Sequence, residues 1–407
     1  MNIVEINNGI TAPKGFLSSG IHCGVKEGYE KKDLGLIYSK IKCTAAGVYT
    51  SNKVKGAPIL VCKKHLQDNK AQAVIVNSGN ANTCNGDDGF LKAEKMTEAA
   101  ACGLKINKED VLVASTGVIG LPLNIEAIEK GIPSLVDSLS ENGSDDTANA
   151  IMTTDTVKKE IAVQFKLSGK DVTIGSISKG SGMIEPNMCT MLSFITTDVN
   201  IKDELLKEAL TEAVNVSYNR VSVDGDMSTN DTILILANGL AENDIIDSKN
   251  EDYYSFLEAL KYVTVKLSKQ VAKDGEGATK LIQCTMSGAR TEDDALILSK
   301  SVINSSLVKA AMFGCDANWG RILCAMGYSK AFFDPEKVNV YFESKQGSII
   351  VCKDGASVNF NEDDALKILK EDEITIKVEL NIGDAEITTW GCDLTYDYVK
   401  INGDYRS

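Results

Sequence analysis

The chain has 407 residues, of which 43% are apolar and 25% charged, as in a globular protein that buries a sizeable core. The 43 Lys and Arg against 57 Asp and Glu give a net charge of −14. That balance argues against nucleic acid or an anionic membrane as a partner, because both attract a basic face. No apolar run reaches the ~20 residues of a membrane helix, and the N-terminal MNIVEINNGI lacks the features of a signal peptide. We therefore expect a cytoplasmic protein.

In the first half of the chain, short Val- and Ile-rich segments alternate with segments that repeat apolar residues at helical spacing. The predicted strands are Leu34–Ile41, Gln72–Asn77, Val111–Ser115, Ile161–Leu167 and Val172–Ile177. The predicted helices are Phe90–Leu104 and Ile125–Leu139. Residues 178–190, SKGSGMIEPNMCT, are rich in turn formers and predict a loop leading into a buried strand that begins near Thr190.

The second half repeats this pattern. Its predicted helices are Asp203–Tyr218, Asp252–Ala272, Thr291–Met312 and Glu362–Lys370, and its predicted strands are Thr232–Ala237, Leu281–Ser287, Ser348–Val351, Ile374–Leu380 and Ala385–Trp390. Thr291, three residues before Asp294, is a candidate helix cap. Alternation over Leu394–Ile401 predicts a further strand. Together these elements indicate a layered α/β protein whose sheets are covered by helices.

Histidine is scarce, which limits the chemistry that the chain can use. His65 lies in the polar stretch CKKHLQDNK and is predicted to be solvated, whereas His22 lies among glycines in a predicted loop or core position. The 11 cysteines contain no Cys-x-x-Cys pair, so neither a zinc ribbon nor a disulfide framework is expected, and most should be buried thiols. A histidine base is therefore not expected.

Two glycine-containing motifs do not fit the cofactor sites that they first suggest. KDGEGATK, residues 273–280, lacks the spacing of a phosphate-binding loop. VDGDMSTNDT, residues 223–232, places Thr229 and Ile235 where a calcium loop needs Gly and Glu. The sequence therefore predicts neither a metal nor an organic cofactor.

A threonine at the head of a strand offers another catalyst. If the peptide bond before it is cut, its own α-amine, with an ordinary pKa of ~7.7–8.0, can act as the base for its hydroxyl. Such a site also needs preset donors for the oxyanion. STGVIG, residues 115–120, follows a predicted strand and could supply them, although it could equally be an ordinary strand-to-helix turn.

Several long motifs in a fixed order carry a family resemblance. They are GFLSSGIHCGVK, VIVNSGNANTCNG, ASTGVIG, AIMTTDT, KGSGMIEPNMCTML, VDGDMSTNDT, DGEGATK, CDANWGRI and YVKINGDYRS. Through them the chain resembles, end to end, the ornithine acetyltransferase family, the glutamate N-acetyltransferases of arginine biosynthesis. The resemblance implies an αββα sandwich, similar to but distinct from the N-terminal nucleophile hydrolases. It also implies self-cleavage between Cys189 and Thr190 into an α chain, 1–189, and a β chain, 190–407.

The resemblance also assigns roles to individual residues. It makes Thr190 the nucleophile and matches Thr116 and Gly117 to the oxyanion pair. The implied substrate-binding residues are Thr153, Lys179, Thr190, Glu276, Asn402 and Ser407. Of these, Lys179 could neutralise a substrate carboxylate and Glu276 could pair with an ammonium group. Two departures are Cys189, where many members have Ala, and the Arg406–Ser407 ending, where others end in Thr.

The implied reaction moves the acetyl group of N-acetylornithine to glutamate through acetyl-Thr190, in a ping-pong cycle without a cofactor. The implied assembly is an α2β2 heterotetramer of the two fragments. The sequence leaves open whether acetyl-CoA is also a donor. Two other functions also remain open, namely an N-terminal-threonine aminopeptidase or amidohydrolase of related fold and a metabolite-binding protein that does not catalyse.

Overall fold

The computed structural model describes residues 2–26, 28, 30–185 and 191–403. The chain divides into two compact units. Unit 1 contains Met1–Gly180, Pro186–Asn219 and Met227–Leu267, and unit 2 contains Ser181–Glu185, Arg220–Asp226 and Ser268–Ser407. Both fragments of the predicted cleavage, 1–189 and 190–407, therefore contribute to unit 1.

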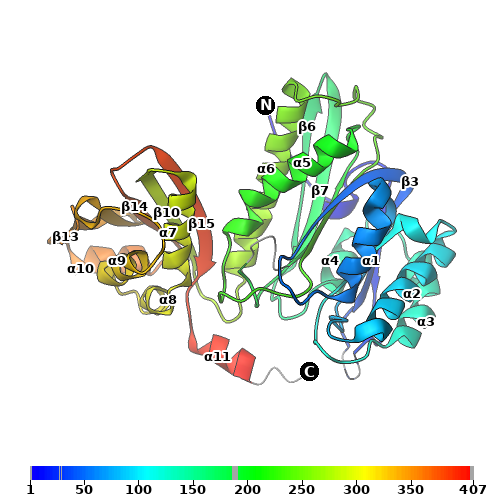
Figure 1. The fold of residues 1–407 in the computed structure, drawn as a ribbon, viewed down its shortest axis with the longest axis horizontal. Coiled ribbons are helices and arrows are strands. Elements are labelled where there is room, and N and C mark those ends of the chain that lie inside the picture. The colour runs from blue at the N-terminus through cyan, green and yellow to red at the C-terminus, as the bar shows by residue number, and fades with distance from the viewer. Residues whose placement is uncertain (1, 27, 29, 186–190, 404–407) are drawn as a thin grey trace. The chain divides into compact units, whose positions relative to one another are not determined.

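Unit 1 is built on a nine-stranded sheet (Figure 1). Its strands are β1 (Val4–Ile6), β2 (Phe16–Ile21), β3 (Leu34–Tyr49), β4 (Lys70–Asn77), β5 (Val111–Ser115), β6 (Lys159–Leu167), β7 (Lys170–Lys179), β8 (Leu192–Thr197) and β9 (Thr232–Ala237). They follow the order β1-β6-β7-β8-β9-β3-β4-β5, and β2 pairs with β3 outside this path. The mixed α/β class is thus confirmed, as are β5 and β9 with their predicted bounds.

Strand β3 is twice as long as predicted, because it pairs with different strands along its length. Its first part, from Leu34 to Ser39, pairs with β2, and its last part, from Thr44 to Tyr49, pairs with β9. Its register against β4 shifts between Tyr38 and Cys43. The Ala- and Gly-containing end of β3 lacks the Val and Ile enrichment by which the sequence analysis recognised strands, so the prediction stopped at residue 41.

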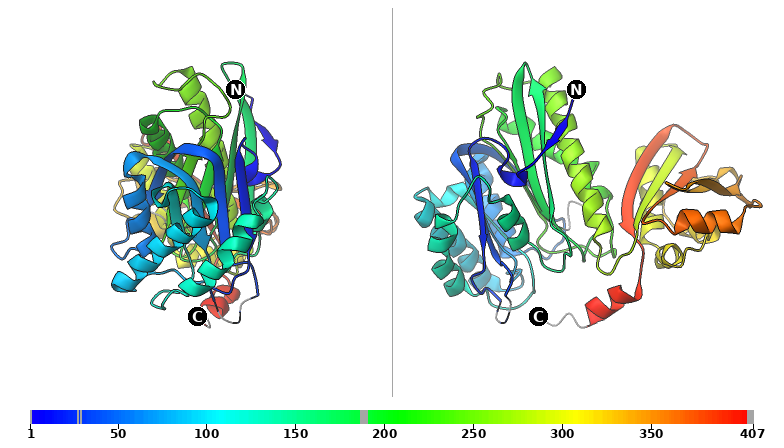
Figure 2. Two further views of the ribbon diagram at one scale, coloured as in Figure 1. Left: turned by 90° about the vertical axis from the view of Figure 1, so that its right-hand side faces the viewer. Right: turned by 180° about the vertical axis from the view of Figure 1, so that it is seen from behind.

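The helices of unit 1 are α1 (Ala57–His65), α2 (Gly86–Leu104), α3 (Ile125–Asp137), α4 (Ser144–Ala150), α5 (Asp203–Asn215) and most of α6 (Glu251–Lys273). Helix α1 packs on β5 and α2, α4 on β2 and β3, and α5 on β3, while α6 runs beside the β6–β7 hairpin (Figures 1 and 2). The prediction for His65 is wrong: it is buried at the end of α1, with Nδ1 2.8 Å from the Val111 carbonyl oxygen. Its helical, strand-facing position outweighs the polarity of its sequence neighbours.

Parallel strand pairs contribute to the apolar core of unit 1. Strands β4 and β5 are parallel, as are β8 and β9. Val74, Ile75 and Val76 are fully buried in succession, as expected for a strand covered on both faces. Strand β8 also pairs antiparallel with β7, from Lys179 opposite Leu192 to Ile174 opposite Thr197. The segment that leads out of the predicted cleavage site is therefore a central strand.

Unit 2 contains a six-stranded sheet in the order β13-β12-β11-β14-β10-β15. These strands are β10 (Leu281–Ala289), β11 (Asn339–Ser344), β12 (Gly347–Lys353), β13 (Ala356–Ser357), β14 (Glu373–Glu379) and β15 (Ala385–Cys392). The helices of this unit are α7 (Glu292–Asn304), α8 (Ser306–Phe313), α9 (Trp319–Gly327), α10 (Glu362–Leu369) and α11 (Tyr396–Gly403). Helices α7 and α10 pack against the sheet.

Two predictions in unit 2 are corrected by the structure. The single helix predicted over Thr291–Met312 is two helices, because Ser305 is extended and its side chain caps α8 by accepting from Val308 N. The strand predicted over Leu394–Ile401 is helix α11, whose start is marked by Thr395 Oγ1 accepting from Asp397 N at 3.2 Å. The cap predicted at Thr291 is confirmed, since its side chain accepts from Asp294 N.

The length and composition of the described helices bear on whether the chain could cross a membrane. No single helix among them is both long and apolar enough, and one pair, α7 with α8, meets the length and composition criteria only in combination, across a 58° bend.

Tyr218 provides a test of how strongly β7 and β8 are joined. Its side chain is fully buried, with its hydroxyl 2.9 Å from Ser178 Oγ on β7 and 3.1 Å from Ser193 Oγ on β8. We expect Tyr218→Phe to destabilise unit 1 by about 1–2 kcal/mol, because two buried hydroxyls lose a partner. Hydrogen exchange of β7 and β8 peptides measures this. Tyr254→Phe, at an exposed ring, is the control, and an equal effect of both changes would contradict the prediction.

Candidate active site

The carboxyl ends of the parallel strands β4 and β5 form the base of the candidate site. Asn77 ends β4 opposite Ser115, which ends β5. The buried Asn77 side chain donates to Ser115 Oγ at 2.7 Å and accepts from the backbone N–H groups of Gly79 and Asn80 at 3.2 and 3.0 Å. One amide thus fixes both loops that leave the sheet at this edge.

Thr116 and Gly117 follow directly on β5 and are held in a defined backbone conformation. Thr116 N donates to the Asn77 carbonyl at 2.9 Å. Gly117 has a φ of +127°, and a Cβ there would lie 2.9 Å from Asn80 N, so only glycine fits this close approach. The Gly117 N–H donates to no acceptor within the described part of the chain. A fixed, unused N–H beside a hydroxyl is a pair of donors that a developing oxyanion requires.

Lys179, at the end of β7, connects two of the predicted site residues. Its Nζ donates to Thr153 Oγ1 at 2.8 Å and lies 3.4 Å from Thr116 Oγ1. Lys179 is also paired with Leu192, the first residue of β8. The structure therefore gathers Thr116, Gly117, Thr153 and Lys179 at one edge of the unit 1 sheet, beside the start of β8.

A buried carboxylate, which the sequence analysis missed, organises this cluster. Asp155 accepts from Lys159 Nζ and from Gly180 N, both at 2.7 Å, and from Thr153 N at 3.1 Å. Its Oδ2, which accepts from Thr153 N, is also 4.0 Å from Lys179 Nζ. Burial disfavours its charged form, but the charges of Lys179 and Lys159 outweigh burial and lower the pKa of Asp155 to about 2. Two ammonium groups therefore face one buried carboxylate at this end of β7.

A second cluster lies within unit 2. Glu276, only 8% exposed, accepts from Asn402 Nδ2 at 2.8 Å, and its backbone N–H donates to the Ser181 carbonyl at 2.9 Å. Gly277 has a φ of +68°, and a Cβ there would approach Tyr398 N to 2.6 Å, so the chain passes close under α11. The predicted pair of Glu276 and Asn402 is thus brought together.

Three predicted site residues, Cys189, Thr190 and Ser407, lie outside the described residues. The sequence assigned no role to Asn77, Asp155 or Asn230. The Asn230 side-chain amide donates to the carbonyls of Ala81 and Ser115 at 2.5 and 2.9 Å. All three lie in motifs that carried the resemblance, namely VIVNSGNANTCNG, AIMTTDT and VDGDMSTNDT. The motifs were a usable signal, but the residue-level roles depend on partners far away in sequence.

These features are those of a mixed α/β protein in which hydrogen-bond donors and ammonium groups gather at the ends of the strands of one sheet. The ArgJ family model matches residues 17–407, so the chain belongs to the ArgJ family. The resemblance stated from the motifs is thereby confirmed.

Individual relatives agree with this family. Arginine biosynthesis bifunctional protein ArgJ 1 of Clostridium acetobutylicum is 54% identical over 401 residues, which cover 98% of each chain. The crystal structure of arginine biosynthesis bifunctional protein ArgJ from Bacillus halodurans is 44% identical, with a TM-score of 0.50, and covers 53% of this chain and 99% of its own. An ornithine acetyltransferase structure from Mycobacterium tuberculosis, complexed with ornithine, is 35% identical with a TM-score of 0.44, and covers 46% of this chain and 100% of its own.

The pKa of Asp155 leads to a pH-dependent prediction. Asp155→Asn should destabilise unit 1 by ~3–5 kcal/mol at neutral pH, because it leaves buried Lys159 without its carboxylate. A lowered pKa means that the wild-type stabilisation is complete above about 3.8 and is lost as the pH falls towards about 2. The difference between wild type and variant should therefore shrink below pH 4.

Urea denaturation followed by far-UV circular dichroism at pH 7, 5, 4 and 3 measures this difference. Fluorescence is less suitable, because both tryptophans, Trp319 and Trp390, belong to unit 2. Asp171→Asn, at an exposed carboxylate paired with exposed Lys166, is the matched control. A difference that is equal at pH 7 and pH 3 would show that the Asp155 charge is not its source.

Proposed function

We propose that this protein transfers the acetyl group of N-acetylornithine to glutamate through an acetyl ester of Thr190. The observation that carries the proposal is the cluster of Lys179, Thr116 and Gly117 beside the start of β8. Strand β8 begins at Leu192, which is two residues after Thr190 in the sequence. Family membership and the names of the relatives support acyl transfer in arginine biosynthesis and do not favour the aminopeptidase alternative.

The proposed reaction begins with processing. Thr190 Oγ attacks the Cys189 carbonyl, the peptide bond is replaced by an ester, and water hydrolyses the ester to free the Thr190 amine. That amine then takes the proton of Thr190 Oγ as the oxygen attacks the acetyl carbonyl. Thr116 Oγ1–H and Gly117 N–H donate to the oxyanion, the amine returns the proton to the leaving ornithine nitrogen, and the amino group of glutamate takes the acetyl group from Thr190.

Charge placement supports the substrate class. The Lys179 ammonium group suits a substrate carboxylate, and the largely buried Glu276 carboxylate suits an ammonium group. We propose that Thr153, Asn402 and Ser407 complete the contacts to the amino-acid part. Neither the residues assigned here nor the steps above require a metal or an organic cofactor. Acetyl-CoA remains a candidate second acetyl donor, because the relatives are named bifunctional.

The sheet of unit 1 supports the proposed two-chain form within an αββα sandwich. Six residue pairs join β7, of the proposed α chain, to β8, of the proposed β chain, and six more join β3 to β9. Cleavage would therefore leave the fragments associated. An α2β2 assembly in the cytoplasm completes this proposal.

Processing can be tested on the purified protein. We expect two bands of roughly 20 and 23 kDa, by residue share of 43.8 kDa, that co-elute under native conditions and separate only in denaturant. The larger should begin Thr-Met-Leu-Ser. Thr190→Ala should give one intact, inactive chain, because the attacking oxygen is gone, whereas Cys189→Ala should still be cut. A single wild-type band with full acetyl transfer would contradict the mechanism.

The oxyanion role can be tested separately. We expect Thr116→Ala to lower kcat by ~10²–10³-fold, the usual cost of one such donor, with little change in KM for N-acetylornithine. Thr211→Ala, whose hydroxyl donates to the Lys207 carbonyl within α5, is the control for a threonine change in unit 1. The measurement is steady-state transfer to glutamate by enzyme whose processing has been verified, and an effect confined to KM would make Thr116 a binding residue only.

A further inference from the structure

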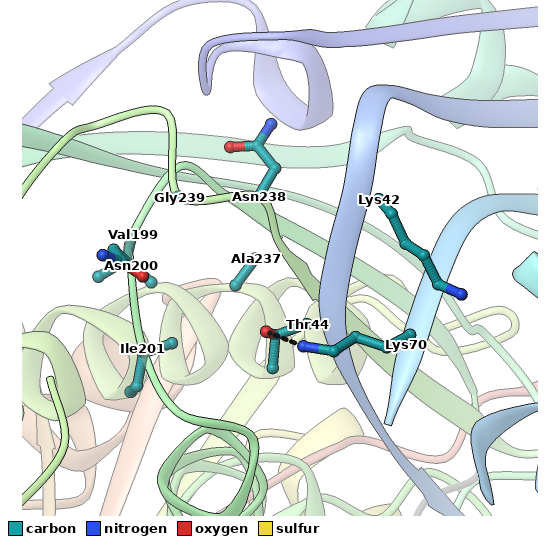
Figure 3. A pocket seen from close by; sticks show the side chains of 9 residues that line it. All are labelled: Lys42, Thr44, Lys70, Val199, Asn200, Ile201, Ala237, Asn238 and Gly239. Atoms are coloured by element: carbon teal, nitrogen blue, oxygen red, sulfur yellow. Dashed lines mark hydrogen bonds between the residues drawn. The ribbon is translucent and has the colours of Figure 1, made fainter. Parts of the chain in front are cut away.

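A cavity of unit 1 lies away from the candidate active site and contains lysines. Its volume is ≈ 320 Å³ (Figure 3). It is lined by Lys42, Thr44, Lys70, Val199, Asn200, Ile201, Ala237, Asn238 and Gly239. The lining residues come from β3, from the start of β4, and from the segments at the ends of β8 and β9.

The cavity lies at the carboxyl ends of the parallel strands β8 and β9. Thr197 and Ala237, the last residues of these strands, are register partners, and Thr44 is paired with both Ala237 and Lys70. The candidate active site is at the other end of β8, where Leu192 pairs with Lys179. A six-residue strand spans about 20 Å, so the cavity is a separate site. The carboxyl ends of parallel strands are common places for ligands.

Lys70 and Thr44 present hydrogen-bond donors in this cavity. Lys70 Nζ points towards Thr44 and donates to its Oγ1 at 3.0 Å (Figure 3). No carboxylate oxygen of the described residues lies within 4.0 Å of Lys70 Nζ. An ammonium group has three N–H donors, and a hydroxyl that accepts one bond can still donate its own hydrogen. Two N–H groups and one O–H therefore remain for a ligand oxygen.

The surrounding charges leave Lys70 as the cation that is available. Lys42 Nζ is already paired with Asp110 at 2.6 Å and with Asp68 at 3.6 Å, and in Figure 3 it points away from Asn238. Asp203, at the start of α5, also interacts electrostatically with Lys70, but its Oδ2 accepts from Asn69 Nδ2 at 2.8 Å. An incoming anion thus meets one ammonium group without a bound carboxylate.

The opposite wall combines buried apolar residues with hydrogen-bonded asparagines. Val199, Ile201 and Ala237 are buried. The Asn238 side chain is fixed by donating to the Lys14 carbonyl at 2.8 Å and accepting from Leu240 N at 3.1 Å, and Asn200 N donates to Asn243 Oδ1 at 2.8 Å. The wall is therefore preorganised, whereas the Lys70 side chain can adjust to a ligand.

We propose that this cavity binds a small aliphatic carboxylate. Lys70 Nζ and Thr44 Oγ1 donate to its carboxylate oxygens, and its hydrocarbon part packs against Val199, Ile201 and Ala237. A carboxylate fits the adjacent donors, and a short hydrocarbon chain fits both the volume and the apolar wall. The inference does not depend on the proposed acetyl transfer, because it uses none of the residues assigned to that reaction.

Propionate is the probe, titrated as its sodium salt at constant ionic strength and followed by ligand-observed NMR. We expect saturable binding by the wild-type protein. Lys70→Met should raise the dissociation constant at least tenfold, and Thr44→Val should raise it severalfold while keeping the charge. Lys166→Met, which removes one exposed charge of unit 1, should change little. Lys179→Met should also change little, because the active-site cluster is not involved. Thermal unfolding verifies that each variant is folded.

Four results would overturn the proposal. The first is the absence of saturable propionate binding, and the second is a loss of affinity in Lys166→Met equal to that in Lys70→Met. The third is propionate binding that is lost in Lys179→Met but kept in Lys70→Met. The fourth is binding of inorganic phosphate that depends on Lys70 in a protein that does not bind propionate. The last result would show that the apolar wall has no part in recognition. Because activity is not measured, failure here is distinct from failure of the proposed acetyl transfer.

Discussion

The candidate active site depends on one buried carboxylate, Asp155. It is bonded to Lys159 on β6, to the backbone of Gly180 after β7, and to the backbone of Thr153, and it faces Lys179. Without this anion, two ammonium groups would be buried close together in a medium that screens them poorly. With it, Lys179 has an opposite charge nearby and reaches Thr153 and Thr116 from a largely buried position. The carboxylate thus fixes the geometry of groups that it does not itself present to a substrate.

The second constraint is that the proposed nucleophile, Thr190, comes two residues before the central strand β8 in the sequence. A strand such as β8, paired on both sides, has little freedom to shift its register, because a slip of one residue would exchange the side chains packed on its two buried faces. Its first residue pairs with Lys179, and its neighbour β9 pairs with the far half of β3. A chain break before β8 would therefore leave β8 itself in the sheet, since the hydrogen bonds that hold it come from β7 and β9.

The sequence predicted the helices and strands that have strong local patterns. The prediction failed where contacts with residues distant in sequence determine the secondary structure. Val111–Ser115 and Thr232–Ala237 were predicted with their observed bounds, because their Val-, Ile- and Leu-rich runs are short and bounded by turn formers. The far half of β3 was missed because its strand character comes from pairing with β9. At Leu394–Ile401 an alternating pattern was outweighed by helical capping at Thr395.

The candidate site shows the same division. Motifs identified Thr116, Gly117, Thr153 and Lys179, and the structure brings these four together. They could not assign a role to Asp155, because a carboxylate in AIMTTDT has no evident partner until the fold places two lysines beside it. Nor could any local pattern reveal the cavity at Lys70, whose lining comes from segments up to about 200 positions apart in the sequence.

Two ends of the β8–β9 pair thus carry hydrogen-bond donors of different kinds. At the amino end, the Gly117 N–H belongs to a backbone that is fixed by Asn77 and by the close contact with Asn80. A fixed donor without an acceptor within the described chain suits an oxygen whose charge develops during reaction, because no reorganisation is needed at that moment. At the carboxyl end, the donor is the flexible ammonium of Lys70, bonded to a neutral hydroxyl. Ordering such a side chain on binding costs conformational entropy, and this cost offsets part of the favourable interaction energy. A donor of this kind suits reversible binding better than catalysis.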